Sequence, residues 1–112
     1  MENMIVKYGK EIQGVFCHWD NGATGVLQAA KAAGMTGLFI VGVDGNRAGY
    51  VQVLSSEQSV SIAQDFTVMT KKDLELAKAV LAGKKVDPIN FVPLTVVDKA
   101  LIDSGEFDMP EW

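Results

Sequence analysis

Three short apolar segments, separated by helical patterns, constrain the fold of this chain most strongly. The segments lie within residues 12–19, 37–43 and 58–63. The middle segment is almost wholly apolar, which is typical of a parallel strand that is buried on both faces. Strands that alternate with helices through short connections predict an α/β fold, with a parallel sheet covered by helices on both faces. Such an arrangement is flavodoxin-like.

The helical patterns have recognisable starts and ends. Four helices are expected, at about residues 2–9, 20–34, 47–55 and 70–83. Asp20 and Asn21 are good N-cap residues for the second helix. Thr70 and Asp73 form a capping-box pair for the fourth helix, which Gly83 ends. The sequence therefore predicts a helix after each of the three apolar strands.

The last part of the chain gives weaker signals. A final strand is expected over residues 91–97, and Pro93 within it favours a sheet edge or a crossing between lobes. The acidic tail, residues 103–112, is assigned no structure. At 112 residues, with 48% hydrophobic residues, the chain is expected to form a single domain with one core.

Charge and composition exclude several classes of function. The net charge is −4, so the chain lacks the clustered basic residues that nucleic-acid binding requires. Cys17 lies in an apolar run and is expected to be a small buried side chain, and its neighbour His18 would lie on the opposite strand face, so the two do not predict a zinc site. No glycine-rich phosphate loop and no nucleophile with a base is present. No enzyme activity, metal or cofactor is predicted.

Sorting signals are also missing from the sequence. The first residues lack the long apolar core of a secretory signal. No apolar run approaches the roughly 20 residues that a membrane-spanning helix needs.

Polar side chains follow each of the three early strands. The carboxyl ends of parallel strands meet at one edge of a sheet, where ligands of open α/β folds bind. Asp, Asn and Gln match the alternating donors and acceptors of a sugar, and an indole ring can cover its C–H face. The predicted ligand-binding residues at this edge are Trp19, Asp20, Asn21, Asp44, Asn46 and Gln64.

Each of these residues also has a purely structural interpretation. Asp20 and Asn21 are typical helix caps. The segment Asp44–Asn46 has the composition of an ordinary turn with Gly45 at positive φ. Trp19 alone is more typical of a core than of a ligand platform. Gln64 has the weakest structural explanation, because a long amide at the end of an apolar strand needs polar partners.

These junctions resemble segments of a known family. The runs Gly14–Gly25, Ile40–Gly45 and Ser61–Asp65 are similar to three ordered motifs of periplasmic sugar-binding proteins related to ribose-binding protein. The segments Leu81–Lys85 and Val92–Val97 resemble the family's closing helix and strand. The resemblance extends over nearly the whole chain.

The resemblance implies a function and a set of contacts. It implies that the chain binds a monosaccharide or related polyol for an ABC sugar transporter, in the periplasm or as an extracellular lipoprotein. The family's ligand-binding Asn corresponds to Trp19, its strand-ending Asp to Asp44 and its crossover Gln to Gln64. Asp20, directly after Trp19, is implied to be either a ligand contact or a helix cap. An indole in place of an amide exchanges a hydrogen bond for stacking, so the preferred sugar is expected to differ from ribose.

The resemblance also implies that much of a two-lobe protein is absent. The chain corresponds to the later part of the second lobe, so we expect a truncated C-terminal lobe in which sugar binding is impaired. An exposed sheet edge predicts self-association, including exchange of the helix Thr70–Gly83 between two copies. The alternative function is the effector domain of a LacI-type sugar-responsive repressor. That class usually carries an Asp-Asp pair where this chain has Asp44-Gly45, so the transporter interpretation is favoured.

Overall fold

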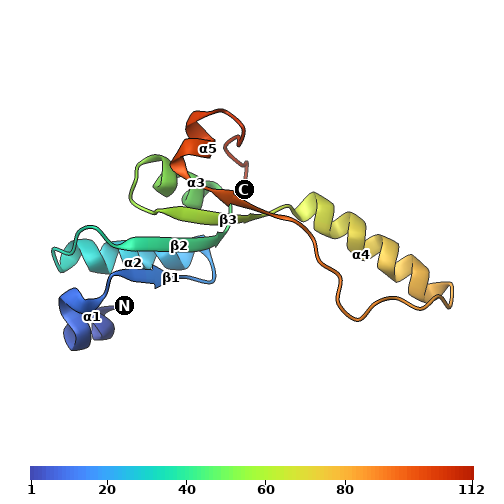
Figure 1. The fold of residues 1–112 in the computed structure, drawn as a ribbon, viewed down its shortest axis with the longest axis horizontal. Coiled ribbons are helices and arrows are strands. Elements are labelled where there is room, and N and C mark those ends of the chain that lie inside the picture. Colours follow the sequence, from blue (N-terminus) through green and yellow to red (C-terminus); the bar gives the residue numbers. More distant parts are fainter. The chain divides into compact units, whose positions relative to one another are not determined.

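The computed structural model describes all 112 residues, and strands alternate with helices as expected (Figure 1). In chain order the elements are α1 (Glu2–Tyr8), a 3₁₀ turn (Gly9–Glu11), β1 (Gly14–Phe16), α2 (Asp20–Ala32), β2 (Phe39–Asp44), α3 (Arg47–Leu54), β3 (Val60–Gln64), α4 (Phe66–Leu81), β4 (Leu94–Val97) and α5 (Lys99–Asp103). Two compact units are formed, one by residues 1–63 with 96–112 and the other by residues 64–95. Each unit is described by itself.

The sheet has the strand order β1-β2-β3-β4. β1 runs parallel to β2, with Phe16 opposite Val41, and β2 runs parallel to β3, with Asp44 opposite Ala63. The expected α/β class is therefore confirmed, with a mostly parallel sheet and flanking helices. β4 lies at the sheet edge and begins directly after Pro93, which cannot donate a backbone hydrogen bond to a neighbouring strand.

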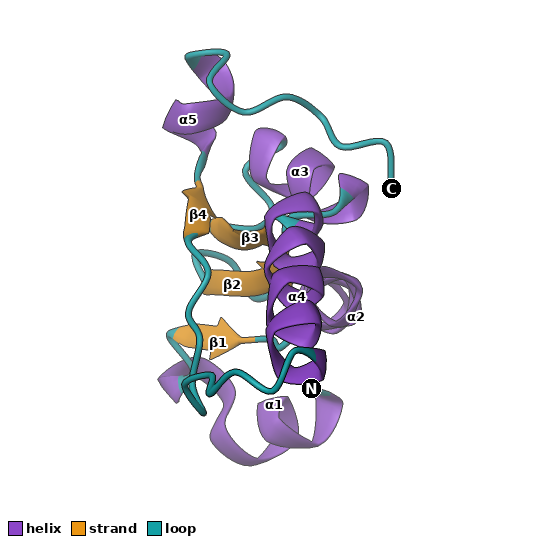
Figure 2. Cartoon of the chain, turned by 90° about the vertical axis from the view of Figure 1, so that its right-hand side faces the viewer, coloured by secondary structure: helices purple, strands orange, loops and turns teal.

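In the first unit, α2 and α3 pack against the same face of the sheet (Figure 2). Cys17, Ala23, Leu27 and Ile40 form the core between β1, β2 and α2. The opposite face carries Phe16 and Phe39, each more than half exposed. The sequence analysis expected burial on both faces, but in this unit one face is buried and the other is only partly covered. An apolar composition indicates that a strand is central in its sheet, but it does not say which faces of the sheet are covered by helices.

The end of the chain completes this unit. A second core cluster joins Val53, Ala63, Val97 and Ile102, so α5 covers the region between α3 and β3. The sequence analysis had assigned no helix here. Asp98 caps α5, because its carboxylate accepts a hydrogen bond from the Leu101 N–H at 2.8 Å. The tail packs back onto α3: the Phe107 ring stacks on Tyr50, and the Arg47 N–H donates to the Trp112 carbonyl.

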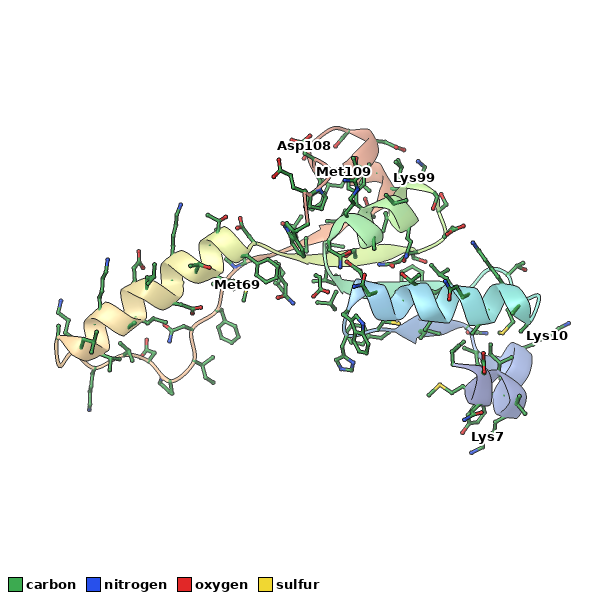
Figure 3. All side chains as sticks on the ribbon, turned by 180° about the vertical axis from the view of Figure 1, so that it is seen from behind. Lys7, Lys10, Met69, Lys99, Asp108 and Met109 are labelled. Carbon is green, nitrogen blue, oxygen red and sulfur yellow. The ribbon has the colours of Figure 1, made fainter.

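The second unit contains α4. This helix begins at Phe66, because the Asp65 carboxylate caps it by accepting from the Val68 N–H at 3.0 Å. The predicted start at Thr70 with Asp73 was therefore wrong by five residues, because the cap is Asp65. The predicted end is confirmed, since α4 stops at Leu81 and Gly83 has a φ of +71°. No residue of α4 is buried, and the side chains of this helix, including Met69, are shown in Figure 3.

Candidate functional site

The carboxyl ends of β1 and β2 meet at the same edge of the sheet. The pairing with β2 continues one residue beyond the end of β1, because the Cys17 N–H donates to the Val41 carbonyl at 2.8 Å. The strand is shorter than predicted, so Cys17, His18 and Trp19 lie in the loop after β1 and not on alternate strand faces. The Cys17 side chain is buried, as expected. Burial, and secondarily the negative charge of Asp20, raise the pKa of this thiol.

Asp20 is the centre of a buried hydrogen-bond network at this edge. It is the first residue of α2 and is 0% exposed. One carboxylate oxygen, Oδ2, accepts from the backbone N–H groups of Gly45 at 3.0 Å and Asn46 at 3.2 Å. The other, Oδ1, accepts from Gln58 Nε2 at 3.0 Å. The Ser61 hydroxyl lies 2.8 and 2.9 Å from the two oxygens. Asp20 thus ties the start of α2 to the loop after β2 and to β3.

Two glycines make room for this carboxylate. A Cβ added to Gly42 would lie 2.1 Å from Asp20 Oδ1, and one added to Gly49 would lie 2.2 Å from Oδ2. Either side chain would overlap the carboxylate. The helix-cap prediction for Asp20 and Asn21 was wrong, since the N-cap position is Trp19 and no side chain caps this end. Asn21 is instead an exposed residue of the first turn.

Asp44 ends β2 in an unusual backbone conformation. Its φ is +123°, and Gly45 follows with a φ of +72°. A positive φ on a residue with a side chain is strained, and such strain gathers at functional sites. A Cβ on Gly45 would approach the Ala63 Cβ to 2.3 Å, so this position requires glycine. The double left-handed turn directs the chain from β2 over the end of β3 and onward into α3.

The Asp44 carboxylate lies at the start of α2. Burial raises its pKa, and the charge of Asp20 raises it further, whereas a hydrogen bond from the Asp20 backbone N–H lowers it. That backbone bond places the carboxylate beside the Trp19–Asp20 junction. The structure therefore brings together residues that follow β1 and β2, as the sequence predicted for these two strands.

Trp19 presents an open aromatic ring at this junction. The residue is 54% exposed. Ring atoms Cε2, Cδ2 and Cζ2 lie 2.9–3.1 Å from the position that a Cβ on Gly22 would occupy. The indole therefore rests on the first turn of α2. Its remaining surface is accessible, as a stacking platform requires.

The other predicted residues occupy two further positions. Asn46 is the N-cap of α3, where its Oδ1 accepts from the Gly49 N–H at 3.0 Å. This bond gives Asn46 a structural role as a helix cap, where the sequence had indicated a turn residue, and it leaves the side-chain amide N–H groups unengaged. Gln64 is half-buried and is the last residue of β3, directly after the Ala63 that pairs with Asp44. It begins the second compact unit.

Sequence analysis missed two residues of the site framework. Ser61 and Gln58 are 0% and 1% exposed, and both donate to Asp20. Gln58 Nε2 also donates to the Val60 carbonyl at 2.8 Å. A possible signal was present, since a serine inside an apolar strand and a glutamine just before it need partners when they are buried. Nothing in the sequence identifies Asp20 as that partner.

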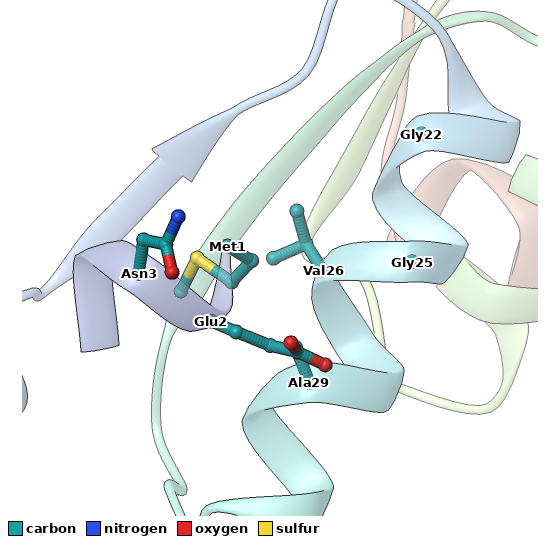
Figure 4. Close-up of a pocket in the computed structure, with 7 residues that line it drawn as sticks. All are labelled: Met1, Glu2, Asn3, Gly22, Gly25, Val26 and Ala29. Carbon is teal, nitrogen blue, oxygen red and sulfur yellow. The ribbon is translucent and has the colours of Figure 1, made fainter. Parts of the chain in front are cut away.

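A separate hollow of about 400 Å³ lies between α1 and α2 (Figure 4). It is lined by Met1, Glu2, Asn3, Gly22, Gly25, Val26 and Ala29. The α2 side contributes only glycines and small apolar side chains. The chain forms no cluster of three or more side chains suited to hold a metal ion. None of its helices combines the length and apolar character needed to cross a membrane.

Comparison with known proteins gives a consistent result. The sequence family described as "periplasmic binding protein domain" matches residues 1–85. The xylitol-binding protein of Mycolicibacterium smegmatis is 37% identical over 100 residues, which cover 88% of this chain and 29% of that protein. The ribose import binding protein of Bacillus subtilis is 33% identical over 94 residues, covering 84% and 30%. These relatives are binding proteins and not enzymes, as expected.

Solved structures extend the similarity to the fold. An ABC transporter solute-binding protein from Agrobacterium vitis, with bound allitol, superimposes with a TM-score of 0.77 at 23% identity. The match covers 94% of this chain and 38% of that one. The chain spans less than a third of the length of the xylitol-binding and ribose-import relatives.

Proposed function

Because this chain belongs to the periplasmic binding protein family, we propose that it is part of the sugar- or polyol-binding component of an ABC transporter. Within that component it would correspond to the second, C-terminal lobe, and the whole chain would act as one domain of it. Two of its relatives are named as a xylitol-binding protein and a ribose import binding protein. These names support a small polyhydroxylated ligand. They favour transport over the effector domain of a repressor.

The geometry at the strand ends supports a division of roles among the predicted residues. Asp44 accepts hydrogen bonds from two adjacent ligand hydroxyls, because an ionised carboxylate offers only acceptors. Trp19 covers the C–H face of the ligand with its open ring. Asn21 and Asn46 supply further donors and acceptors at the rim. Gln64, at the end of β3, stays a predicted ligand contact. Asp20 holds the loops in place from below, since its oxygens are occupied by groups of the chain itself.

The conformation of Asp44 is the observation that carries this proposal. A β-strand that ended without a ligand-binding role would gain stability from glycine at a φ of +123°. Burial and the neighbouring negative charge also oppose ionisation of the carboxyl group. Both costs are explained when a ligand's hydroxyl groups donate to the ionised side chain, because charge-assisted hydrogen bonds are among the stronger ones.

Affinity for a sugar is expected to be weak in this chain alone. A small ligand gains most of its binding free energy when a pocket encloses it, and we propose that a second lobe supplies the other wall. A dissociation constant in the millimolar range, or about −4 kcal/mol, is the expected order for contacts on one side only.

Titration with ribose, xylitol and allitol tests the proposal. The 112-residue chain is labelled with ¹⁵N, and amide shifts are followed as each ligand is raised to tens of millimolar. Saturable shifts that gather on residues 19–21 and 44–46, and that are lost in Asp44→Ala, are expected. An exposed carboxylate variant, Asp73→Ala, serves as the matched control. Shifts that are absent for all three ligands, or that survive in Asp44→Ala, would contradict the proposed site.

Partners and location follow from the same assignment. We propose a membrane ABC permease as the partner of the complete protein, and the periplasm or the outer surface of the cell as its location.

Self-association through a sheet edge or the Thr70–Gly83 helix stays a prediction. Light scattering tests it, and a monomeric mass at all concentrations would contradict it.

A further inference from the structure

Gly22 lies directly beneath the indole of Trp19, one helical turn further along the chain. Three ring atoms lie 2.9–3.1 Å from the place where a Cβ would stand. Carbon atoms that are not bonded pack at about 3.5–4.0 Å, so the ring occupies space that any other residue would fill. We propose that Gly22 is a specificity-determining residue, which sets the height of the Trp19 ring over α2 and thereby the position of the ligand's stacking face. This inference rests on the proposed function.

The backbone gives no other reason for glycine at this position. Gly22 is not among the residues with positive φ, so a side chain could adopt its conformation. Glycine is also the least favourable helix residue after proline. Its helix is therefore less stable than an alanine would make it, and the contact that explains the choice is the one with the indole.

Gly25, in the same helix, provides a matched comparison. It too lacks a positive φ, but a Cβ there would meet nothing within 4 Å. Both glycines line the hollow between α1 and α2, as Figure 4 shows. Alanine at either position therefore raises helix propensity and adds a methyl group beside the same hollow. Only alanine at position 22 displaces the indole.

The displacement has a defined consequence for binding. Moving the ring from about 3 Å to an ordinary contact distance shifts it by roughly half an ångström to one ångström. Ligand hydroxyls held by Asp44 could then no longer stay in place while the C–H face meets the ring. Loss of an aromatic contact of ordinary strength corresponds to a three- to tenfold weaker affinity. Ligands that do not use the ring would be unaffected, so the change is one of preference as well as strength.

The test compares Gly22→Ala with Gly25→Ala. Both are made in a Trp112→Phe background, which leaves Trp19 as the one tryptophan, since the sequence contains two. Emission maximum and acrylamide quenching report the environment of the indole without any ligand. A shift in both for Gly22→Ala, with none for Gly25→Ala, is expected. Unchanged emission and quenching in Gly22→Ala, or equal changes in both variants, would overturn the inference.

Thermal unfolding and binding complete the test. Gly22→Ala should affect the Tm more favourably in a Trp19→Leu background than in the parent, because the obstacle has been removed, whereas Gly25→Ala should act equally in both backgrounds. An equal effect of Gly22→Ala in the two backgrounds would contradict the proposed contact. With ribose and xylitol as probes, Gly22→Ala should bind three- to tenfold more weakly and Gly25→Ala as the parent does. If the parent binds neither probe, the proposed function fails, whereas the fluorescence result still decides the role of Gly22.

Discussion

Substitution of Asp20 by asparagine should destabilise the first unit strongly. The carboxylate accepts from four separate groups, namely the backbone N–H of Gly45 and of Asn46, the Gln58 amide and the Ser61 hydroxyl. Asparagine has nearly the same shape but can accept on one oxygen only. Placed at Oδ2, its NH₂ group would face two backbone donors. Placed at Oδ1, it would face the donor Nε2 of Gln58.

Either orientation leaves at least one buried donor without an acceptor. Hydrogen bonds to a charged group contribute about 1.5–3 kcal/mol each, and removing the charge weakens those that remain. We therefore expect a loss of about 2–4 kcal/mol in the free energy of unfolding. A domain of this size has about 5–15 kcal/mol in total, and the Tm should fall by roughly 10–30 °C.

Urea unfolding followed by tryptophan fluorescence measures the effect, because Trp19 and Trp112 both belong to the first unit. The control is Asp103→Asn, which removes an exposed ion pair with Lys99 that contributes at most about 0.5 kcal/mol. Midpoints that move equally in the two variants would refute the reasoning. A double-mutant cycle of Asp20→Asn with Ser61→Ala should also show a coupling of about 0.5–3 kcal/mol.

Three further substitutions test individual features. Asp44→Asn should raise the Tm at pH 7, because burial and Asp20 raise the pKa of this carboxyl in the folded state, so that its ionisation costs stability. The gain should shrink as the pH falls toward the ordinary aspartate pKa of about 3.9, and a pH-independent gain would contradict this cause. Gly45→Ala should cost about 2–4 kcal/mol in urea unfolding, against about 1 kcal/mol for Gly34→Ala, which has a similar φ but open space around its Cβ. Asp65→Ala should cost α4 about 1 kcal/mol and reduce its helical circular dichroism, and an unchanged spectrum would argue against the cap.

Features encoded within a few residues could be predicted from the sequence. Apolar runs and the glycines at positions 9, 34 and 83 located most strands and helix ends. The start of α4 was misplaced because two local signals competed, and the cap at Asp65 prevailed over the pair at Thr70. Helix α5 was missed because five residues carry little periodicity, and its stability comes from Ile102 in a core assembled by distant segments.

The candidate site shows the same limit. Its location at the strand ends could be anticipated, because parallel strands finish on one side whatever their detailed sequence. The role of Asp20 could not, since its partners lie 25 to 41 residues away along the chain. A side chain next to a helix start has a local explanation as a cap. The long-range role of Asp20, as the acceptor for groups after β2 and around β3, becomes visible only in the folded structure.

All the hydrogen bonds of the Asp20 carboxylate are made to groups inside the chain. Its hydrogen bonds end on backbone N–H groups and on two buried side chains, so the loops are anchored without help from the residues that face outward. An outward residue such as Trp19 is therefore free to vary while the anchor is kept. Under the proposed function, single changes at this surface would alter the preferred ligand and leave the buried anchor of the fold in place.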